Sequence, residues 1–324
     1  MALLVLYWSI MLVCYLLASR LRRFAPRFGF VYRLLDLSIS VLVLLMGLRM
    51  GSNCEVTGSL GTIGAQALLI TVLTAAGSIL GAFAVRKALH IDRYARPRGA
   101  AQESSQSCSA ADADARAAGM KTSLHILMMV AIGMLLGCFA LPHLCDVDAF
   151  QAASGSWMTA ALCVMIGLIG FTMGLENKLV VILHSASIAV LLVPLASTVG
   201  TLAAGAVYSL LSPLTLQEGL AVSAGFGWYT FAPSVITGAG HAVAGAISFL
   251  HNVLRETSGI VLMPLVASKL GFIEAVTLPG TASMDIGVTI AERCCNAETM
   301  PYSFACGTAS SLFCALLVPL IMGA

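Results

Sequence analysis

The chain has 324 residues, of which 59% are hydrophobic and 10% charged, and its formal net charge at pH 7 is +2. So large an apolar share exceeds what a soluble domain can bury, and it favours an all-α protein with many membrane-spanning helices. The small net charge excludes any electrostatic argument for nucleic acid as a partner, and the expected surroundings are a lipid bilayer.

Apolar runs of helical length predict ten membrane helices. We expect them at residues 2–18, 30–50, 62–86, 123–142, 156–175, 180–211, 218–237, 243–268, 276–292 and 302–322. If the seventh and ninth, which contain Gly and Pro, are re-entrant, the number of crossings falls to eight. The first run has no basic segment before it, so we interpret it as an uncleaved helix.

Basic residues alternate between successive loops. The first, third and fifth loops carry Lys or Arg, whereas the second, fourth and sixth carry neither. The positive-inside rule then predicts that the odd-numbered loops are cytoplasmic and that both termini lie on the outer side of the membrane. The third loop, residues 88–121, is rich in small polar residues and predicts a flexible cytoplasmic linker between residues 1–87 and 122–324.

A weak internal repeat spans that linker. Met-Gly-Leu ends the second predicted helix at residues 46–48 and the fifth at 173–175, and a helix rich in small residues follows each, at 75–85 and 197–207. Units of three helices would have opposite orientations in the membrane, as in transporters built from inverted repeats. The alternative is that Gly and Ala recur in any packed membrane helix.

Two carboxylates lie within apolar segments. Glu256 belongs to the stretch 242–270 and Asp285 to the stretch 275–291. An ionised acid at bilayer depth costs roughly 2.5–3.5 kcal/mol on insertion scales, so such residues mark ion or substrate pathways. The substrate is therefore predicted to be a cation, and the protein a transporter.

Glycines interrupt the seventh predicted helix. Gly225 and Gly227 precede Trp228 and Tyr229, and Pro233 follows. These residues weaken a helix and free backbone carbonyls, which a cavity in the protein can satisfy. The aromatic pair could face an ammonium group. The alternative is ordinary packing with an interfacial aromatic anchor.

The ninth predicted helix has the same character. It begins with Pro279 and Gly280, and then offers Thr281 and Ser283 beside Asp285. These hydroxyls and the carboxylate could line one polar edge of a binding site. The alternative is a short loop with a solvated Asp. We expect broken helices around residues 225–233 and 279–287.

The eighth predicted helix carries four polar residues in its middle. Asn252 and Glu256 are four apart and share one face, and His251 and Arg255 share the adjacent face. Glu256 is a candidate for substrate or proton binding, and Arg255 could bind substrate or neutralise one of the acids.

Two further groups are secondary candidates, namely Asp36 in the second helix and His251. Arg33 lies one turn before Asp36, so the two could simply form an interfacial ion pair. His125 and His184 lie near helix ends, where a packing or interfacial role is expected rather than ligation.

The ten cysteines do not form a metal-binding pattern, because Cys294 and Cys295 are adjacent and no Cys-x-x-Cys occurs. Cys54 and Cys145 fall in loops placed outside, where a disulfide could form. We expect neither metal nor cofactor.

Three motifs in register resemble those of the LysO-type lysine exporter family of bacterial inner membranes. They are GFGWYT at 225–230, NVLRE at 252–256 and TASMD at 281–285, and the family shows S-G-F-G-W-Y-S, N-x-x-R-E and A-T-S-M-D. The match is good over residues 215–322 and only general over 1–210. Ala224 replaces the family's Ser, Thr281-Ala282 reverses its A-T, and the residues after Asp285 also depart.

The resemblance implies export of L-lysine and close analogues, by exchange with protons, through a fold with inverted repeats and broken helices. It places Trp228, Tyr229, Asn252, Arg255, Glu256, Ser283 and Asp285 in the family's polar motifs. Asp285 and Glu256 would bind the ammonium group and a proton in turn, since burial favours the neutral form of a carboxyl group. Na⁺ as the coupling ion and a homo-oligomer remain open. No Walker motif is present, so ATP does not drive transport directly.

Three rival interpretations remain. A monovalent-cation/proton antiporter would use the same acids and freed carbonyls. An intramembrane hydrolase would need a nucleophile with a base, but the sequence has no G-x-S-x-G. A non-transporting membrane sensor or scaffold would tolerate loss of both acids.

Overall fold

A computed structural model describes residues 2–23, 28–96, 124–176 and 187–323 of the chain. These residues form helices and no β-strand, which confirms the predicted all-α fold. The elements are α1 (Ala2–Leu21), α2 (Gly29–Gly51), α3 (Cys54–Gly58), α4 (Leu60–Ala88), a helix at Leu124–Leu144 that contains η2 (Leu136–Ala140) and α6 (Leu141–Leu144), α7 (Val147–Glu176), α9 (Ile188–Leu211), α10 (Leu216–Ser223), α11 (Phe231–Gly238), α12 (Ala242–Lys269), α13 (Phe272–Thr277), η3 (Gly280–Met284), α14 (Ile286–Cys294), η4 (Ala297–Thr299) and α15 (Met300–Met322).

The composition and length of the helices define a multi-pass membrane protein. Six of the described helices are long and apolar enough to cross a bilayer: α2, α4, Leu124–Leu144, α7, α9 and α15. Large apolar side chains such as Val72, Leu80 and Val199 are exposed on their surfaces. Such faces suit lipid as the surrounding medium. The helix α12 is equally long, but it is more polar and contributes many buried residues to the interior.

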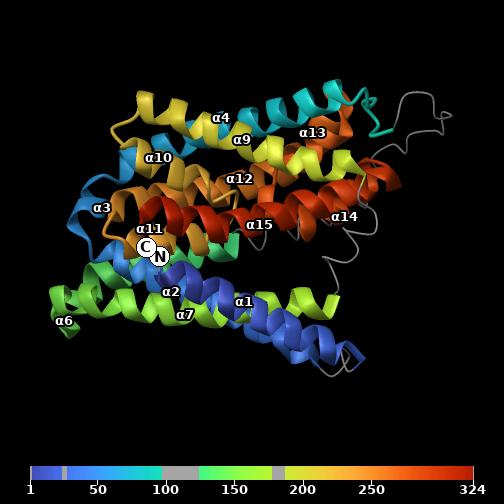
Figure 1. Ribbon diagram of the computed structural model, residues 1–324. Coiled ribbons are helices and arrows are strands. Elements are labelled where there is room, and N and C mark those ends of the chain that lie inside the picture. Colours follow the sequence, from blue (N-terminus) through green and yellow to red (C-terminus); the bar gives the residue numbers. More distant parts are fainter. Residues whose placement is uncertain (1, 24–27, 97–123, 177–186, 324) are drawn as a thin grey trace.

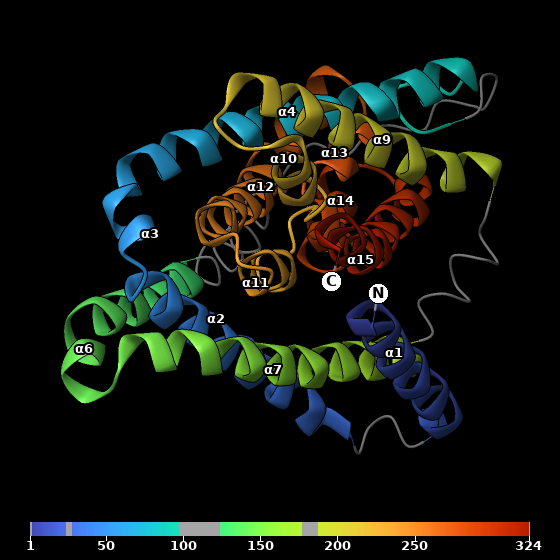
Figure 2. The same ribbon diagram turned by 60° about the vertical axis from the view of Figure 1, so that its left-hand side comes forward.

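The helices form two layers, which Figure 1 and Figure 2 both show. The smaller layer contains α1, α2, the helix Leu124–Leu144 and α7; α1 packs along α7, and α2 contacts both η2 and α7. The larger layer contains α4, α9 and the elements from α10 to α15; α4 packs along α9. The division of the chain at the third loop is therefore not a division in space, because α4 precedes that loop and packs in the larger layer.

Glycines allow α4 and α9 to touch along their backbones. A Cβ added at Gly81 would lie 2.1 Å from the carbonyl oxygen of Ala196, and one at Gly200 would lie 2.1 Å from that of Gly77. Small residues at such crossings permit close van der Waals packing, which holds helices together where lipid removes the hydrophobic driving force. The small-residue segments therefore form the contact between α4 and α9.

Two segments of the larger layer are interrupted. The first is helical as α10, turns at residues 224–230, and resumes as α11; Phe226 (φ 47°) and Gly227 (φ 90°) adopt left-handed backbone conformations at the turn. The second is helical as α13, passes through η3, and resumes as α14. The backbone N–H of Thr281 donates to the carbonyl of Phe226 at 2.9 Å, so the two interruptions are joined directly.

The observed bounds depart from the predicted ones around α7. This helix begins at Val147 rather than at residue 156, because the Asp146 carboxylate accepts the backbone N–H of Asp148 at 2.9 Å and caps the first turn. The predicted fourth loop is thereby reduced to a short turn. Cys54 and Cys145 are exposed free thiols. The predicted helix start at 180, His184 and linker residues 97–123 lie outside the described residues.

Candidate functional site

Three carboxylates line one cavity between the two layers. Asp36 comes from α2 in the smaller layer, whereas Glu256 on α12 and Asp285 before α14 come from the larger layer. The cavity has a volume of about 340 Å³ and is also lined by Gly227, Trp228, Tyr229 and Thr281. No Lys, Arg or His occurs among its described lining residues. The charge of the cavity wall is therefore that of its acids.

Glu256 is the deepest of the three acids. The residue is only 8% exposed, and no described residue makes a hydrogen bond or an ion pair with its carboxylate. Asp285, Asp36 and the Tyr229 phenol line the same cavity as Glu256. A buried carboxylate is costly unless something pairs with it, so this group is poised for a cation or a proton.

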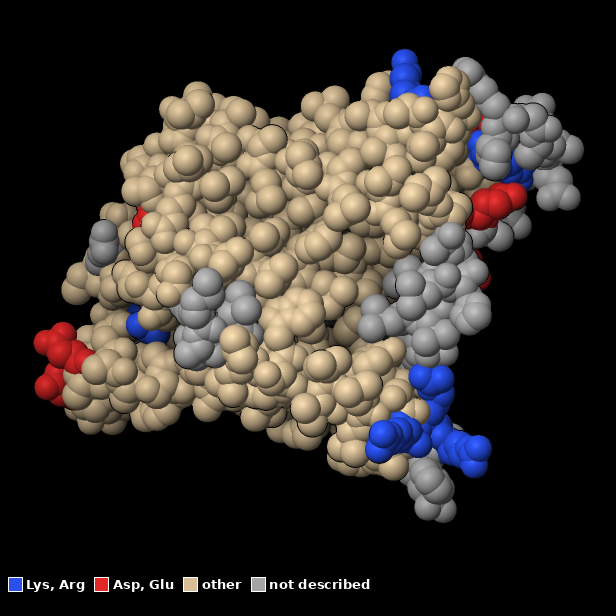
Figure 3. Space-filling view, in the orientation of Figure 1, with Lys and Arg blue, Asp and Glu red and all other residues tan. Residues whose placement is uncertain are grey.

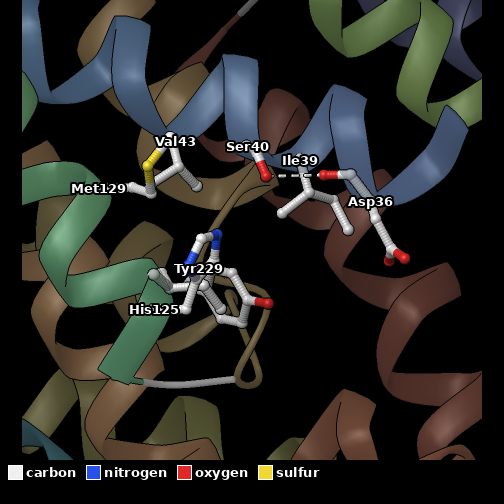
Figure 4. Close-up of a pocket in the computed structure, with 8 residues that line it drawn as sticks. Asp36, Ile39, Ser40, Val43, His125, Met129 and Tyr229 are labelled. Carbon is white, nitrogen blue, oxygen red and sulfur yellow. Dashed lines mark hydrogen bonds between the residues drawn. The ribbon is translucent and has the colours of Figure 1, made fainter. Parts of the chain in front are cut away.

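A second cavity of about 420 Å³ adjoins the first and shares Asp36, Ile39 and Tyr229 with it. Figure 4 shows Asp36 and Ser40 on α2, with Tyr229 and His125 below them in the view, and all four residues line this cavity. The hydroxyl of Ser40 donates to the backbone carbonyl of Asp36 at 2.9 Å and not to its carboxylate. Asp36 thus lies where the two cavities meet.

Asn252 holds the first interruption in place rather than lining the cavity. Its side-chain oxygen accepts the backbone N–H of Gly227 at 2.7 Å, and its side-chain nitrogen donates to the carbonyl of Ser248 at 2.7 Å. A Cβ added at Gly225 would lie 2.4 Å from the Asn252 side-chain nitrogen. Gly225 and Asn252 therefore support the turn that presents Gly227 and Trp228.

Ser283 also lies behind the cavity wall. Its hydroxyl donates to the carbonyl of Val276 at 2.6 Å, and its own carbonyl accepts the hydroxyl of Ser303 at 2.6 Å. The expected polar edge of three side chains thus reduces to Thr281 and Asp285, which both line the cavity. Asp285 is exposed, in contrast to Glu256.

Arg255 and His251 face away from the cavity, towards α9 and α4. The Arg255 guanidinium donates to the Thr201 hydroxyl at 3.3 Å and lies 5.9 Å from the centroid of the Phe226 ring, while its Nε and Nη1 atoms have no partner among the described residues. The Nδ1 atom of His251 lies 2.9 Å from the hydroxyl of Thr71. Arg255 therefore forms no ion pair with Glu256, although the two residues are adjacent in sequence.

The second halves of both interrupted segments begin at the cavity. Thr230, just before α11, and Asp285 and Ile286, at the start of α14, are among the lining residues. The first backbone N–H groups of a helix have no helical partner, and they carry part of the positive end of the helix dipole. Carboxylates and helix N-termini thus meet in one site, so it offers partners for both a cation and an anion.

Three aromatic rings stand between this cavity and a third one. Trp228 lines the first cavity, and its ring centroid lies 5.0 Å from that of Phe231, which in turn lies 5.7 Å from that of Tyr7. Tyr7 lines the third cavity, of about 520 Å³, together with residues of α7, α11 and α15. The fully buried Phe231 ring therefore links the walls of the two cavities.

The sequence did not single out several residues that the structure makes prominent. His125, which was expected to pack, lines the second cavity. Glu274, fully buried, pairs with Arg86 of α4, and Glu218 lies 2.8 Å from the Nδ1 atom of His241. Hydropathy alone could have flagged Glu274, since it lies in an apolar stretch.

Taken together, an all-helical membrane domain, two interrupted helices and an acidic cavity beside them are features of a membrane transporter. The sequence model of the family described as Lysine exporter LysO matches residues 127–322. The chain belongs to this family, and the family consists of transporters rather than enzymes.

Two relatives agree with this membership. The chain is 26% identical over 195 residues to the "Putative lysine exporter" of Haemophilus influenzae, a match that covers 60% of the chain and 95% of the relative. It is 24% identical over 196 residues to the "Lysine exporter LysO" of Escherichia coli (strain K12), which covers 60% of the chain and 62% of that protein. No solved structure matches the chain.

Proposed function

We propose that the protein exports L-lysine and close cationic analogues across the bacterial inner membrane in exchange for protons. The observation that carries this proposal is the Glu256 carboxylate, which is buried, with no partner among the described residues, at the wall of a cavity that Asp285 also lines. An ammonium group and a proton would occupy these acids in turn. The names of the two relatives support lysine as the substrate.

The start of α11 and the start of α14 favour an amino acid over an inorganic cation. A monovalent-cation site needs only carboxylates and carbonyls, whereas this cavity also receives two helix N-termini. Half-helix N-termini suit the carboxylate of an amino acid, because their N–H groups and dipoles favour negative charge. The α-ammonium group would then lie beside Asp285 and Glu256.

The distribution of basic residues supports an orientation. Figure 3 shows most Lys and Arg side chains gathered at one end of the molecule, where Arg20 ends α1 and Arg86 and Lys87 end α4. Under the positive-inside rule this end is cytoplasmic. The acidic cavity then opens towards the cytoplasm, since it is lined by the first half of α2 and the last part of α7, and both termini lie at the periplasmic end.

Pairwise packing supports the proposed inverted repeat. If α1, α2 and α4 correspond to Leu124–Leu144, α7 and α9, then the contact of α1 with α7 corresponds to that of Leu124–Leu144 with α2. The pair α4 and α9, and the pair α2 and α7, each contact their own counterpart. This is the pattern expected of two units related by a twofold axis.

Labelled lysine and inverted membrane vesicles test the proposal. With an acidic lumen, wild-type protein should accumulate lysine, because protons leaving the vesicle drive lysine in. Asp285→Asn keeps the size of the side chain but cannot titrate, so it should abolish accumulation while protein level stays normal. Asp148→Asn, at an exposed acid in the first turn of α7, is the matched control.

Two outcomes would contradict the proposal. Full accumulation by Asp285→Asn would exclude the acid from the transport cycle. If wild-type vesicles exchange Na⁺ or K⁺ for protons but take up no lysine, the protein is a cation/proton antiporter.

A further inference from the structure

One carboxylate of the acidic cavity has no part in the function proposed above. Glu256 and Asp285 suffice for one ammonium group and one proton, yet Asp36 lines the same cavity from the other layer. The sequence offered a structural explanation, an ion pair with Arg33, but no hydrogen bond or ion pair of the Asp36 carboxylate occurs within the described part of the chain. His125 lines the adjoining cavity without pairing with it.

The three acids come from two layers of the molecule and could therefore contact different parts of a bound amino acid. Glu256 and Asp285 lie beside the starts of α11 and α14, where an α-carboxylate and its neighbouring α-ammonium group would bind together. Asp36 lies on α2 in the other layer, at the junction with the second cavity, and Tyr229 lines both cavities as well. An unbranched side chain extending from the α-carbon could reach it across the layer boundary.

We propose that Asp36 receives the side-chain ammonium group of the substrate, so that the two layers together select an amino acid with two amino groups. This inference rests on the proposed function and assigns its specificity to one residue. Glu256 and Asp285 would hold the α-ammonium group and, in the other half of the exchange, a proton, so the second ammonium group of a diamino acid falls to Asp36. Asp36 is exposed where it lines the cavity, so a substrate with one amino group would forgo a charge-assisted contact there.

The test compares two substrates on purified protein in proteoliposomes. Lysine carries the side-chain ammonium group, and 6-hydroxynorleucine replaces it with a hydroxyl group of similar size. Asp36→Asn should raise the KM for lysine by about tenfold or more and leave the KM for 6-hydroxynorleucine within about twofold. The control Asp148→Asn should change neither value.

A second variant makes the test independent of the first. Asp36→Glu moves the carboxylate one methylene further into the cavity, so it should shift the preference from lysine towards ornithine, whose side chain is one methylene shorter. The melting temperature of each variant without substrate reports on folding.

The outcomes separate this inference from the proposed function. If Asp36→Asn raises the KM for both substrates equally, or keeps the wild-type preference for lysine, Asp36 does not bind the side-chain ammonium group. An unchanged substrate preference in Asp36→Glu would overturn the inference as well. A wild-type protein that transports no lysine would instead refute the proposed function.

Discussion

At the scale of single residues, the side chains of Arg255 and Glu256 diverge although they are neighbours. Successive residues of a helix point about 100° apart, so Glu256 faces the cavity with Asn252 on its side of α12, whereas Arg255 and His251 face α4 and α9. The spacing in the sequence predicted these two faces. It could not predict which face meets the cavity, because that depends on which helices pack on either side of α12.

The separation of these two residues leads to a prediction on stability. Glu256→Gln removes a buried charge that has no described partner, so the melting temperature of the purified protein should stay at or slightly above the wild-type value. Lysine export should nevertheless be lost. Breaking a buried ion pair with Arg255 would instead cost about 3–5 kcal/mol, and the double change Arg255→Gln with Glu256→Gln would then restore folding.

Asp36 and His125 show the limit of sequence reasoning at this scale. Each is a single polar residue in an apolar helix, and their positions in the chain are far from the motifs that carry Glu256 and Asp285. The structure brings them to Tyr229 through packing between layers. Nothing local in the sequence encodes that proximity.

At the scale of elements, the turn between α10 and α11 depends on backbone conformation. Gly and Pro near mid-membrane predicted that a helix would be weakened there, but the hydrogen bond from Gly227 to Asn252 and the approach of Pro279 arise only in the folded chain. The sequence therefore indicated the place of the interruption, and tertiary contacts determine its shape.

A pair of glycine variants tests this dependence. Gly227 has φ 90°, and an added Cβ would lie 2.8 Å from the carbonyl oxygen of Pro279. Gly227→Ala should therefore cost roughly 1–2 kcal/mol for the left-handed conformation alone and should reduce transport sharply. Gly238→Ala, in α11 with no atom within 4 Å of the added Cβ, should keep wild-type melting temperature and transport. Equal behaviour of both variants would show that the turn tolerates side chains.

At the scale of the whole molecule, residues distant in the chain form each layer. Hydropathy predicted most of the helices, because each long apolar run reports its own membrane crossing. The assignment of α4 to the larger layer was not predictable, since the contact of α4 with α9 joins residues from both sides of the third loop. The acidic cavity could not be predicted either, because its lining combines residues of both layers that are distant in the chain.

The orientation of the whole molecule can be tested by labelling. In a cysteine-free background, single cysteines at Ser52 and Ala152 should react with a membrane-impermeant thiol reagent in intact cells, because both positions lie at the end that lacks the basic cluster. A cysteine at Ser105, in the third loop, should react only after the membrane is opened. Labelling of position 105 from outside would reverse the proposed topology.

The hydrogen bond from Thr281 to Phe226 has a consequence for movement. It joins the two interruptions through the main chain, so a shift of one must either break this bond or displace the other. The starts of α11 and α14, which follow these interruptions, would then move together. A molecule bound to both would move with them and would keep its contacts to both helix starts. Asp36 belongs to the other layer. If it holds the side-chain ammonium group as proposed, such a movement would break that contact first.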